Sequence, residues 1–288
     1  MVKTVKQGFE TLKQNLEITD LQATTVSTRQ QNVRESIAAE MNILDSFLAG
    51  SYKRNTMIAP LYESDIDIFV ILHPDYYKSD GQAFLLDKVK TVLKKTYPKT
   101  PEISRNGQAV TITFNDFMVD VVPTFNRQGG GYLIPDSIQK RWISTDPSKH
   151  TEIWSAENKS HNGDLIPLIK MMKGWNKENN AVLRSFHLES LIIKILKDIK
   201  IADFKSGVRY LLYHLRGQVQ YPLPDPAGYD DNLASYLDSQ DKIRRAINGI
   251  ESAYQKAVRA EQLEERGEVV EAISKWKEIF GTYFPAYG

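Results

Sequence analysis

Three aspartates in the first half of the chain have the residue type and spacing of a metal-binding cluster. Asp65 and Asp67 alternate in DIDIFVIL, whose β-branched and aromatic residues predict a strand. Alternate residues of a strand leave the same face, so the two carboxylates project together while Ile66 and Ile68 point into the core. Asp120 lies in FMVDVV, where the apolar neighbours demand burial and a solvated acid is not expected.

Such a cluster would do phosphoryl-transfer chemistry. Neighbouring carboxylates raise one another's pKa, and a divalent cation relieves their repulsion. Oxygen ligands in a chain without cysteine favour Mg²⁺ or Mn²⁺ over zinc. Two such ions can lower the pKa of an attacking hydroxyl and neutralise the charge of a triphosphate.

A simpler interpretation of the same aspartates is structural. Asp65 and Asp67 could cap a loop, and Asp120 could pair with a lysine. The upstream Gly50-Ser51 turn favours the metal site instead, because its N–H groups and hydroxyl can hold phosphates.

Four residues in the second half of the chain could bind a nucleotide. Lys170 and Lys173 lie three residues apart in LIKMMKGW, on one helical face opposite its apolar stripe, which could equally be a solvated basic face. The Ser185 hydroxyl could contact phosphate or act as a helix N-cap. Phe186 could stack on a base or pack in the core.

The elements that must position these residues change from strands to helices along the chain. The periodicity predicts a helix over 29–48, where Val33, Ile37, Met41 and Leu44 form the apolar stripe, a strand over 65–72 and a helix over 81–96. Asn115-Asp116 separates AVTITF from FMVDVVPTF, which predicts a β-hairpin.

The second half is predicted to be helical. Residues 127–160 are rich in turn signals and predict a loop, with a lobe boundary near 150–163. Helices are expected from Asp164 to Trp175 and then over 185–199, 203–216, 231–238 and 241–280. We therefore predict an α+β fold with two domains, a catalytic lobe with an N-terminal helix at 1–155 and a helical lobe at 156–288.

The composition excludes several classes of protein. Hydrophobic residues at 41% and charged residues at 25% are ordinary globular values, so the chain is not disordered. The absence of cysteine excludes disulfide scaffolds, iron–sulfur clusters and a thiol nucleophile. A net charge of +1 disfavours an obligate DNA-coating protein. No signal-peptide pattern or apolar run of membrane-spanning length is present, so we expect a cytoplasmic protein without a membrane partner.

The arrangement of these motifs resembles the polymerase-β-like nucleotidyltransferases, and more narrowly their cyclic-oligonucleotide synthases. That group comprises the bacterial CD-NTases, cyclic GMP–AMP synthase and 2′-5′ oligoadenylate synthetase. The segments that carry the resemblance, which spans roughly residues 25–285, are Gly50-Ser51, SDIDI at 64–68, VDV at 119–121, LIKMMKGW at 168–175, LRSFHLE at 183–189 and WKEIFG at 276–281. The resemblance implies a mixed-sheet nucleotidyltransferase core, a helical C-terminal lobe and an active site in the cleft between them.

The resemblance also implies an activity. A Mg²⁺-dependent enzyme, or one using Mn²⁺, would condense ribonucleoside triphosphates into a cyclic di- or trinucleotide messenger and release pyrophosphate. The expected substrates are ATP and, with it, GTP, UTP or CTP. Two ions would lie on the catalytic aspartates, and the donor triphosphate would contact Gly50, Ser51, Lys170, Lys173 and Ser185, with Phe186 stacked on a base.

The biological role implied is anti-phage signalling of the CBASS type. A downstream effector would recognise the product, and control by a regulatory protein partner is left open. The alternatives are a synthase of linear oligonucleotides, an RNA-extending nucleotidyltransferase and an inactive nucleotide-sensing module.

Overall fold

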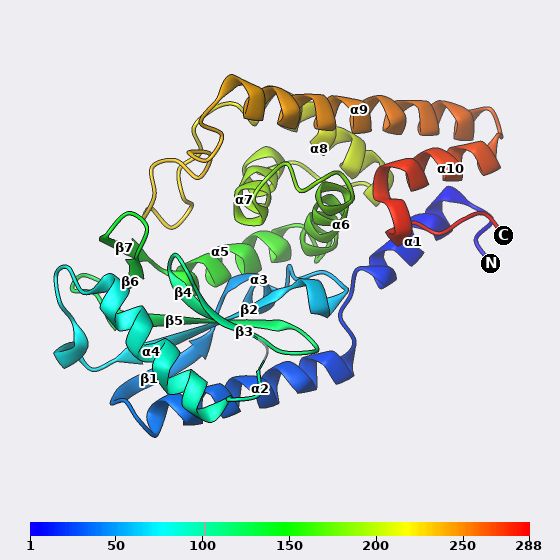
Figure 1. Cartoon of the computed structure of the whole chain (residues 1–288). Coiled ribbons are helices and arrows are strands. Elements are labelled where there is room, and N and C mark those ends of the chain that lie inside the picture. Colours follow the sequence, from blue (N-terminus) through cyan, green and yellow to red (C-terminus); the bar gives the residue numbers. More distant parts are fainter. Residues whose placement is uncertain (101) are drawn as a thin grey trace. The chain divides into compact units, whose positions relative to one another are not determined.

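The computed structural model describes residues 1–100 and 102–288 (Figure 1). The chain divides into two compact units, which we call the sheet unit (18–152) and the helical unit (1–17 with 153–288). The second boundary lies close to the predicted residue 155, while the first helix groups with the helical unit rather than with the sheet. The predicted α+β class, with a mixed sheet followed by helices, is confirmed.

The sheet unit is built on a mixed sheet with the strand order β1-β2-β5-β4-β3, and β6 pairs with both β5 and β7. Strands β2 and β5 are parallel, and the other pairs are antiparallel. The strands are β1 Ile43–Leu48, β2 Asp65–Leu72, β3 Glu102–Asn106, β4 Ala109–Thr113, β5 Met118–Asn126, β6 Tyr132–Asp136 and β7 Arg141–Thr145. The predicted strand at 65–72 and the predicted hairpin, formed by β4 and β5, are confirmed.

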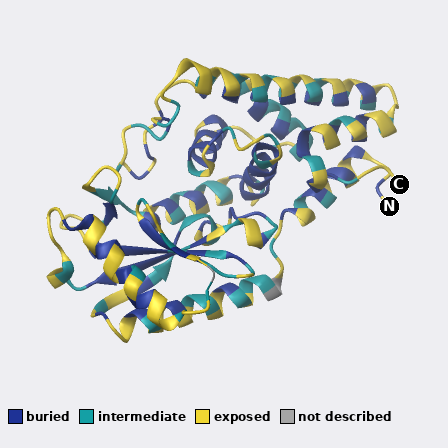
Figure 2. Ribbon diagram, in the orientation of Figure 1, coloured by how far each residue is buried: buried dark blue, intermediate teal, exposed yellow. Residues whose placement is uncertain are grey.

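Two helices, α2 (Asp20–Ala38) and α4 (Gln82–Thr96), pack on one face of this sheet. That face is apolar: Ile66, Ile68 and their neighbours on β5 are buried in one core with both helices, as the dark strands of Figure 2 show. Helix α4 confirms the helix predicted over 81–96. Because side chains alternate along a strand, the residues between these apolar positions must leave the opposite face.

The prediction of one helix over 29–48 is wrong at its C-terminal half. Helix α2 ends at Ala38, and Ile43–Leu48 forms β1, antiparallel to β2. Leu44 continued the apolar spacing in the sequence, yet it is 51% exposed, whereas Met41 before it is buried. The helix begins at a capping box formed by Thr19 and Gln22.

The prediction of a mostly irregular stretch over 127–160 is also wrong. The glycines at 129–131, all with positive φ, form only the turn between β5 and β6. After that turn the chain forms β6, β7 and the helix α5 (Pro147–Ser160). Short strands of this kind are stabilised by their pairing partners, which local sequence does not reveal.

The helical unit consists of packed helices, of which α9 lies along both α8 and α10 (Figure 1). Its elements besides the C-terminal part of α5 are α1 Val5–Asn15, α6 Leu165–Glu178, α7 Ser185–Leu196, α8 Phe204–Gln218, α9 Gln240–Glu265 and α10 Val269–Phe280. Helices α6, α7 and α8 confirm three predicted helices. The predicted helix over 231–238 is wrong, because those residues form turns, and the predicted helix over 241–280 is broken at Gly267, whose φ is +78°.

The two ends of the chain lie together in the helical unit (Figure 1). Val2 and Tyr287 form a parallel bridge, and the Gly288 N–H donates to the Val2 carbonyl at 3.1 Å. No helix within 1–100 and 102–288 has the length and apolarity needed to cross a membrane.

Candidate active site

Strand pairing brings the three predicted aspartates onto one face of the sheet. Asp67 on β2 is the register partner of Asp120 on β5, and Asp65 precedes Asp67 by two residues. Val119 and Val121, which flank Asp120, are fully buried among the residues under α2 and α4. The carboxylates therefore occupy the opposite face, as the alternation in the sequence predicts.

Asp120 has a hydrogen-bond partner that the sequence analysis did not identify. Thr111 is its register neighbour on β4, and the Thr111 hydroxyl donates to Asp120 Oδ1 at 2.5 Å. The two-residue loop Asn115-Asp116 of the predicted hairpin places Thr111 opposite Asp120, so the signal for this contact was present in the sequence. Because β4 pairs with β5, the Thr111 hydroxyl lies within hydrogen-bond distance of Asp120 and orients its carboxylate.

The electrostatics of the cluster favour a bound cation. Loss of surrounding water and, secondly, the Asp120 carboxylate raise the pKa of Asp65, although its side chain keeps solvent exposure. Burial also raises the pKa of Asp120, and the bond from Thr111 partly offsets this. In the part of the chain that the structure describes, the side chains as they stand form no group of three ready to hold a metal ion. The donor set has the oxygen chemistry that Mg²⁺ prefers, and enclosing an ion requires the carboxylates to turn toward one point.

Gly50 lies directly against the Asp67 carboxylate. It begins the short helix α3 (Gly50–Lys53) with φ of +62°, and a Cβ added at this position would overlap Asp67 Oδ2. The Ala49 N–H donates to the Asp67 carbonyl at 2.9 Å, which ties this turn to β2. The carbonyl of Ser51 accepts hydrogen bonds from the backbone N–H groups of residues 56 and 57. These bonds fix the segment that follows the Gly50-Ser51 turn.

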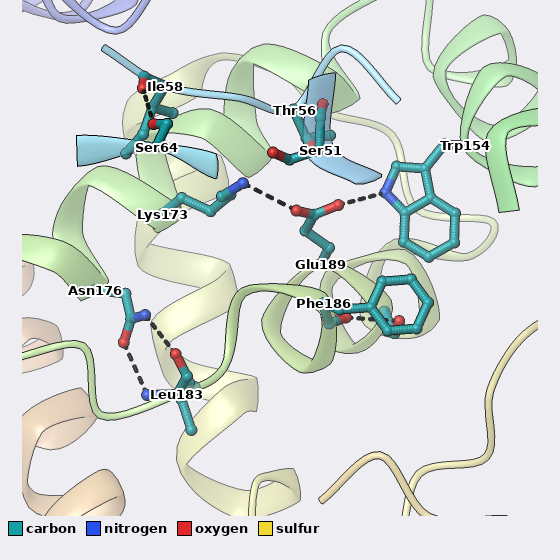
Figure 3. Close-up of polar contacts among 11 residues, drawn as sticks. Ser51, Thr56, Ile58, Ser64, Trp154, Lys173, Asn176, Leu183, Phe186 and Glu189 are labelled. Carbon is teal, nitrogen blue, oxygen red and sulfur yellow. Dashed lines mark hydrogen bonds and ion pairs between the residues drawn. The ribbon is translucent and has the colours of Figure 1, made fainter. Parts of the chain in front are cut away.

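Within the helical unit, Lys173 is held by a buried acid (Figure 3). Its Nζ lies 3.0 Å from Glu189 Oε1, and Trp154 Nε1 donates to Glu189 Oε2 at 3.0 Å. The side chains of Lys173 and Glu189 are 7% and 0% exposed. Lys170 is buried as well, with its Nζ 2.6 Å from Glu17 Oε2. The interpretation of these lysines as a solvated basic face is therefore wrong.

Ser185 and Phe186 open helix α7 next to this group. Ser185 is exposed and is the first residue of the helix. The N-cap is Arg184 and not Ser185, which the sequence analysis considered for this position. The half-buried Phe186 ring stacks on Trp154, with centroids 5.5 Å apart and planes 13° from parallel. Neither Trp154 nor Glu189 was singled out as a functional residue from the sequence.

The turn before α7 is fixed to α6 by a reciprocal pair of hydrogen bonds (Figure 3). Asn176 Nδ2 donates to the Leu183 carbonyl at 2.7 Å, and the Leu183 N–H donates to Asn176 Oδ1 at 3.0 Å. Both side chains are buried. The turn therefore sets where Ser185 and Phe186 lie relative to the helix that carries Lys173.

Comparison with known proteins shows what this chain is similar to. A family model described as the Second Messenger Oligonucleotide or Dinucleotide Synthetase domain (SMODS) matches residues 3–158. A cyclic AMP-AMP-AMP synthase from an Acinetobacter strain is 28% identical over 99% of this chain and 86% of its own length. The CBASS oligonucleotide cyclase CdnC from Escherichia coli is 23% identical over 82% of this chain and 81% of its own. A chain of the solved E. coli CdnC:HORMA-deltaN complex has the same fold, with a TM-score of 0.76 at 15% identity over 98% of both chains.

Proposed function

The chain belongs to the SMODS family of second messenger oligonucleotide or dinucleotide synthetases. We therefore propose that its aspartate cluster is the catalytic centre in which the oligonucleotide is synthesised. The protein is a nucleotidyltransferase that makes a cyclic oligonucleotide in CBASS anti-phage signalling. Its substrates are nucleoside triphosphates. We propose ATP as one of them, since the similar Acinetobacter protein is named for a product made of AMP units.

The family consists of metal-dependent enzymes, and we propose two Mg²⁺ ions for this chain. Asp65 and Asp67 would hold both ions and Asp120 would hold one, because all three offer oxygen ligands on one sheet face. When bound, the ions would supply charge neutralisation at the triphosphate and a lower pKa at the attacking hydroxyl.

The residues of the chain itself perform the remaining steps of the proposed reaction. Asp120, oriented by Thr111, accepts the proton of the attacking ribose hydroxyl, whose oxygen bonds to the α-phosphorus of the donor. The bond from that phosphorus to the pyrophosphate oxygen breaks, and pyrophosphate leaves. A second transfer of the same kind, within the product, closes the ring.

The donor nucleotide is proposed to bind Gly50, Ser51, Lys170, Lys173 and Ser185 through its triphosphate and Phe186 through its base. Lysine suits this role as a compact charge with three donors. Lys170 forms an ion pair with Glu17 in the absence of nucleotide. The triphosphate would therefore have to share Lys170 with Glu17 or displace Glu17 from it. Base selection would then depend on the residues around Phe186.

The observation that carries this proposal is the register pairing of Asp67 with Asp120 on parallel strands. Asp67→Ala should abolish product formation and leave the melting temperature almost unchanged, since the site faces away from the core under α2 and α4. The assay incubates the protein with labelled NTPs and Mg²⁺, treats the products with phosphatase and separates them. A cyclic product resists phosphatase because it has no terminal phosphate.

The matched control is Asp75→Ala, which removes a carboxylate that is 84% exposed on the same unit. It should retain full turnover. Normal product formation by Asp67→Ala would rule out the metal-site assignment. Products that are all phosphatase-sensitive would indicate linear synthesis, and a wild-type chain that is inactive alone should be tested with a protein activator, since the similar CdnC is solved in complex with HORMA.

A further inference from the structure

Glu189 is a fully buried acid that joins three helices of the helical unit (Figure 3). It lies on α7, accepts from Lys173 on α6 through Oε1 and accepts from Trp154 on α5 through Oε2, both at 3.0 Å. A buried carboxylate is unfavourable unless it is paired and hydrogen-bonded. Here each oxygen has a donor of its own.

The contacts of Glu189 with Lys173 and Trp154 constrain the chemistry of this position. The lysine ammonium and the indole N–H can only donate hydrogen bonds. A carboxylate offers an acceptor to each of them, whereas the amide of glutamine would direct its NH₂ group at one of the two donors. Position 189 therefore needs an anionic side chain with two acceptor oxygens, and a polar side chain of the same size is not sufficient.

The Trp154 contact extends the effect of Glu189 to the aromatic residue proposed to bind the base. Trp154 stacks on Phe186 with an interplanar angle of 13°. The hydrogen bond from Nε1 fixes the rotation of the indole ring, and the indole covers one face of Phe186. The orientation of the ring proposed as a base platform thus depends on the same carboxylate that holds the lysine proposed for the triphosphate.

We propose that Glu189 is a positioning residue of the donor nucleotide site, which sets Lys173 for the triphosphate and, through Trp154, Phe186 for the base. This inference rests on the proposed function. Glu189 itself acts on the nucleotide only through these partners. Its loss should therefore weaken nucleotide binding more than it slows the chemical step, which takes place at the aspartates.

The test compares Glu189→Gln with Trp154→Phe. Glu189→Gln should raise KM for ATP at least ten-fold while kcat changes less than three-fold. Trp154→Phe removes the indole N–H together with part of the ring that stacks on Phe186, and leaves the Lys173 contact of Glu189 in place, so KM should rise two- to three-fold. The Kd of a non-hydrolysable ATP analogue with Mg²⁺, measured by calorimetry, should change in parallel with KM.

This binding measurement separates failure of the inference from failure of the proposed function. A wild-type protein that does not bind the analogue would contradict the proposed donor site itself. A wild type that binds while Glu189→Gln binds equally well, or loses only kcat, would overturn the role of Glu189.

A second comparison covers the case in which Glu189→Gln does not fold. The double variant Lys173→Met with Glu189→Met replaces the ion pair by apolar groups of similar volume, a change that folded proteins often tolerate. Its Kd should lie within about three-fold of that of Lys173→Met alone, because Glu189 then has no lysine to position and only its bond to Trp154 is lost. A further loss of ten-fold or more would contradict the proposed role.

Discussion

At the scale of single residues, the tightest packing in the proposed catalytic centre is the contact of Gly50 with Asp67. The backbone of Gly50 has φ of +62°, a conformation that residues other than glycine rarely adopt, and the absence of a Cβ leaves room for Asp67 Oδ2. Two independent reasons thus require glycine at this position. The same absence of a side chain lets the turn at the start of α3 approach the carboxylate.

Gly50→Ala should yield a folded protein with product formation reduced by about a hundred-fold, because a displaced catalytic group of this kind costs roughly that factor. The added methyl group would push the Asp67 carboxylate out of its position. Initial rates and a thermal melt measure the two effects. The control is Gly217→Ala on α8, where a Cβ meets nothing within 4 Å and full activity is expected. Equal rates for both variants would contradict the argument.

At the scale of elements, the start of α7 is held by a small, partly buried hydrogen-bond network. The Arg184 N–H donates to the Tyr236 hydroxyl at 3.0 Å, and this hydroxyl lies 2.9 Å from His187 Nδ1. Burial lowers the pKa of His187 to about 4 and raises the pKa of Tyr236. Both side chains are therefore neutral at pH 7, and the connector before α9 is attached to the helix that carries Ser185 and Phe186.

His187 should make the stability of the protein fall on mild acidification. Its pKa is 6.5 in the unfolded chain and about 4 in the folded one, so the unfolded state binds more protons between these values. The contribution is fully present above pH 6.5 and is lost as pH falls toward 4. It amounts to about 2 kcal/mol between pH 7 and pH 5, at about 1.4 kcal/mol per pH unit below 6.5.

Urea unfolding of the wild type and of His187→Gln at pH 7 and pH 5 measures this effect. Glutamine can still hydrogen-bond Tyr236 but does not titrate, so the variant should lose about 2 kcal/mol less than the wild type on acidification. The same pH dependence in both proteins would show that other groups cause it.

At the scale of the whole molecule, the N-terminal segment 1–17 belongs to the helical unit, although the sheet unit (18–152) separates this segment from the rest of the helical unit in sequence. The Phe9 ring on α1 packs edge-on against Trp276, Phe280 and Phe284, with centroid distances of 4.8, 6.1 and 5.4 Å. The segment that follows α1 carries Glu17, the partner of Lys170. The packing of α1 therefore helps to place Glu17 beside Lys170, one of the lysines proposed to bind the triphosphate.

Phe9→Ala should destabilise the protein by about 3–5 kcal/mol, as expected for the loss of a buried aromatic ring. The side chain is only 3% exposed. Denaturant unfolding gives the change, and Val270→Ala on the partner helix α10, which is 50% exposed, should alter stability by no more than about 0.5 kcal/mol. A similarly small change for Phe9→Ala would show that α1 is only loosely attached.

The sequence by itself determined the features that depend on short-range periodicity. The strand at 65–72 and the shared face of Asp65 and Asp67 follow from the two-residue repeat of a strand. Helices α6, α7 and α8 follow from apolar spacing, and the resemblance carried by the motifs was enough to predict the family. The predictions of strands and helices needed only neighbouring residues.

Only the tertiary structure decided which distant residues meet. It paired Ile43–Leu48 with β2, where local spacing predicted a helix, and it aligned Asp67 on β2 with Asp120 on β5. It buried Lys173 against Glu189, which the sequence places in the LRSFHLE motif without indicating its partner. The physical reason is that strand register and ion pairs are selected by partners far along the chain, and the free energy of burial that selects them is a property of the folded core.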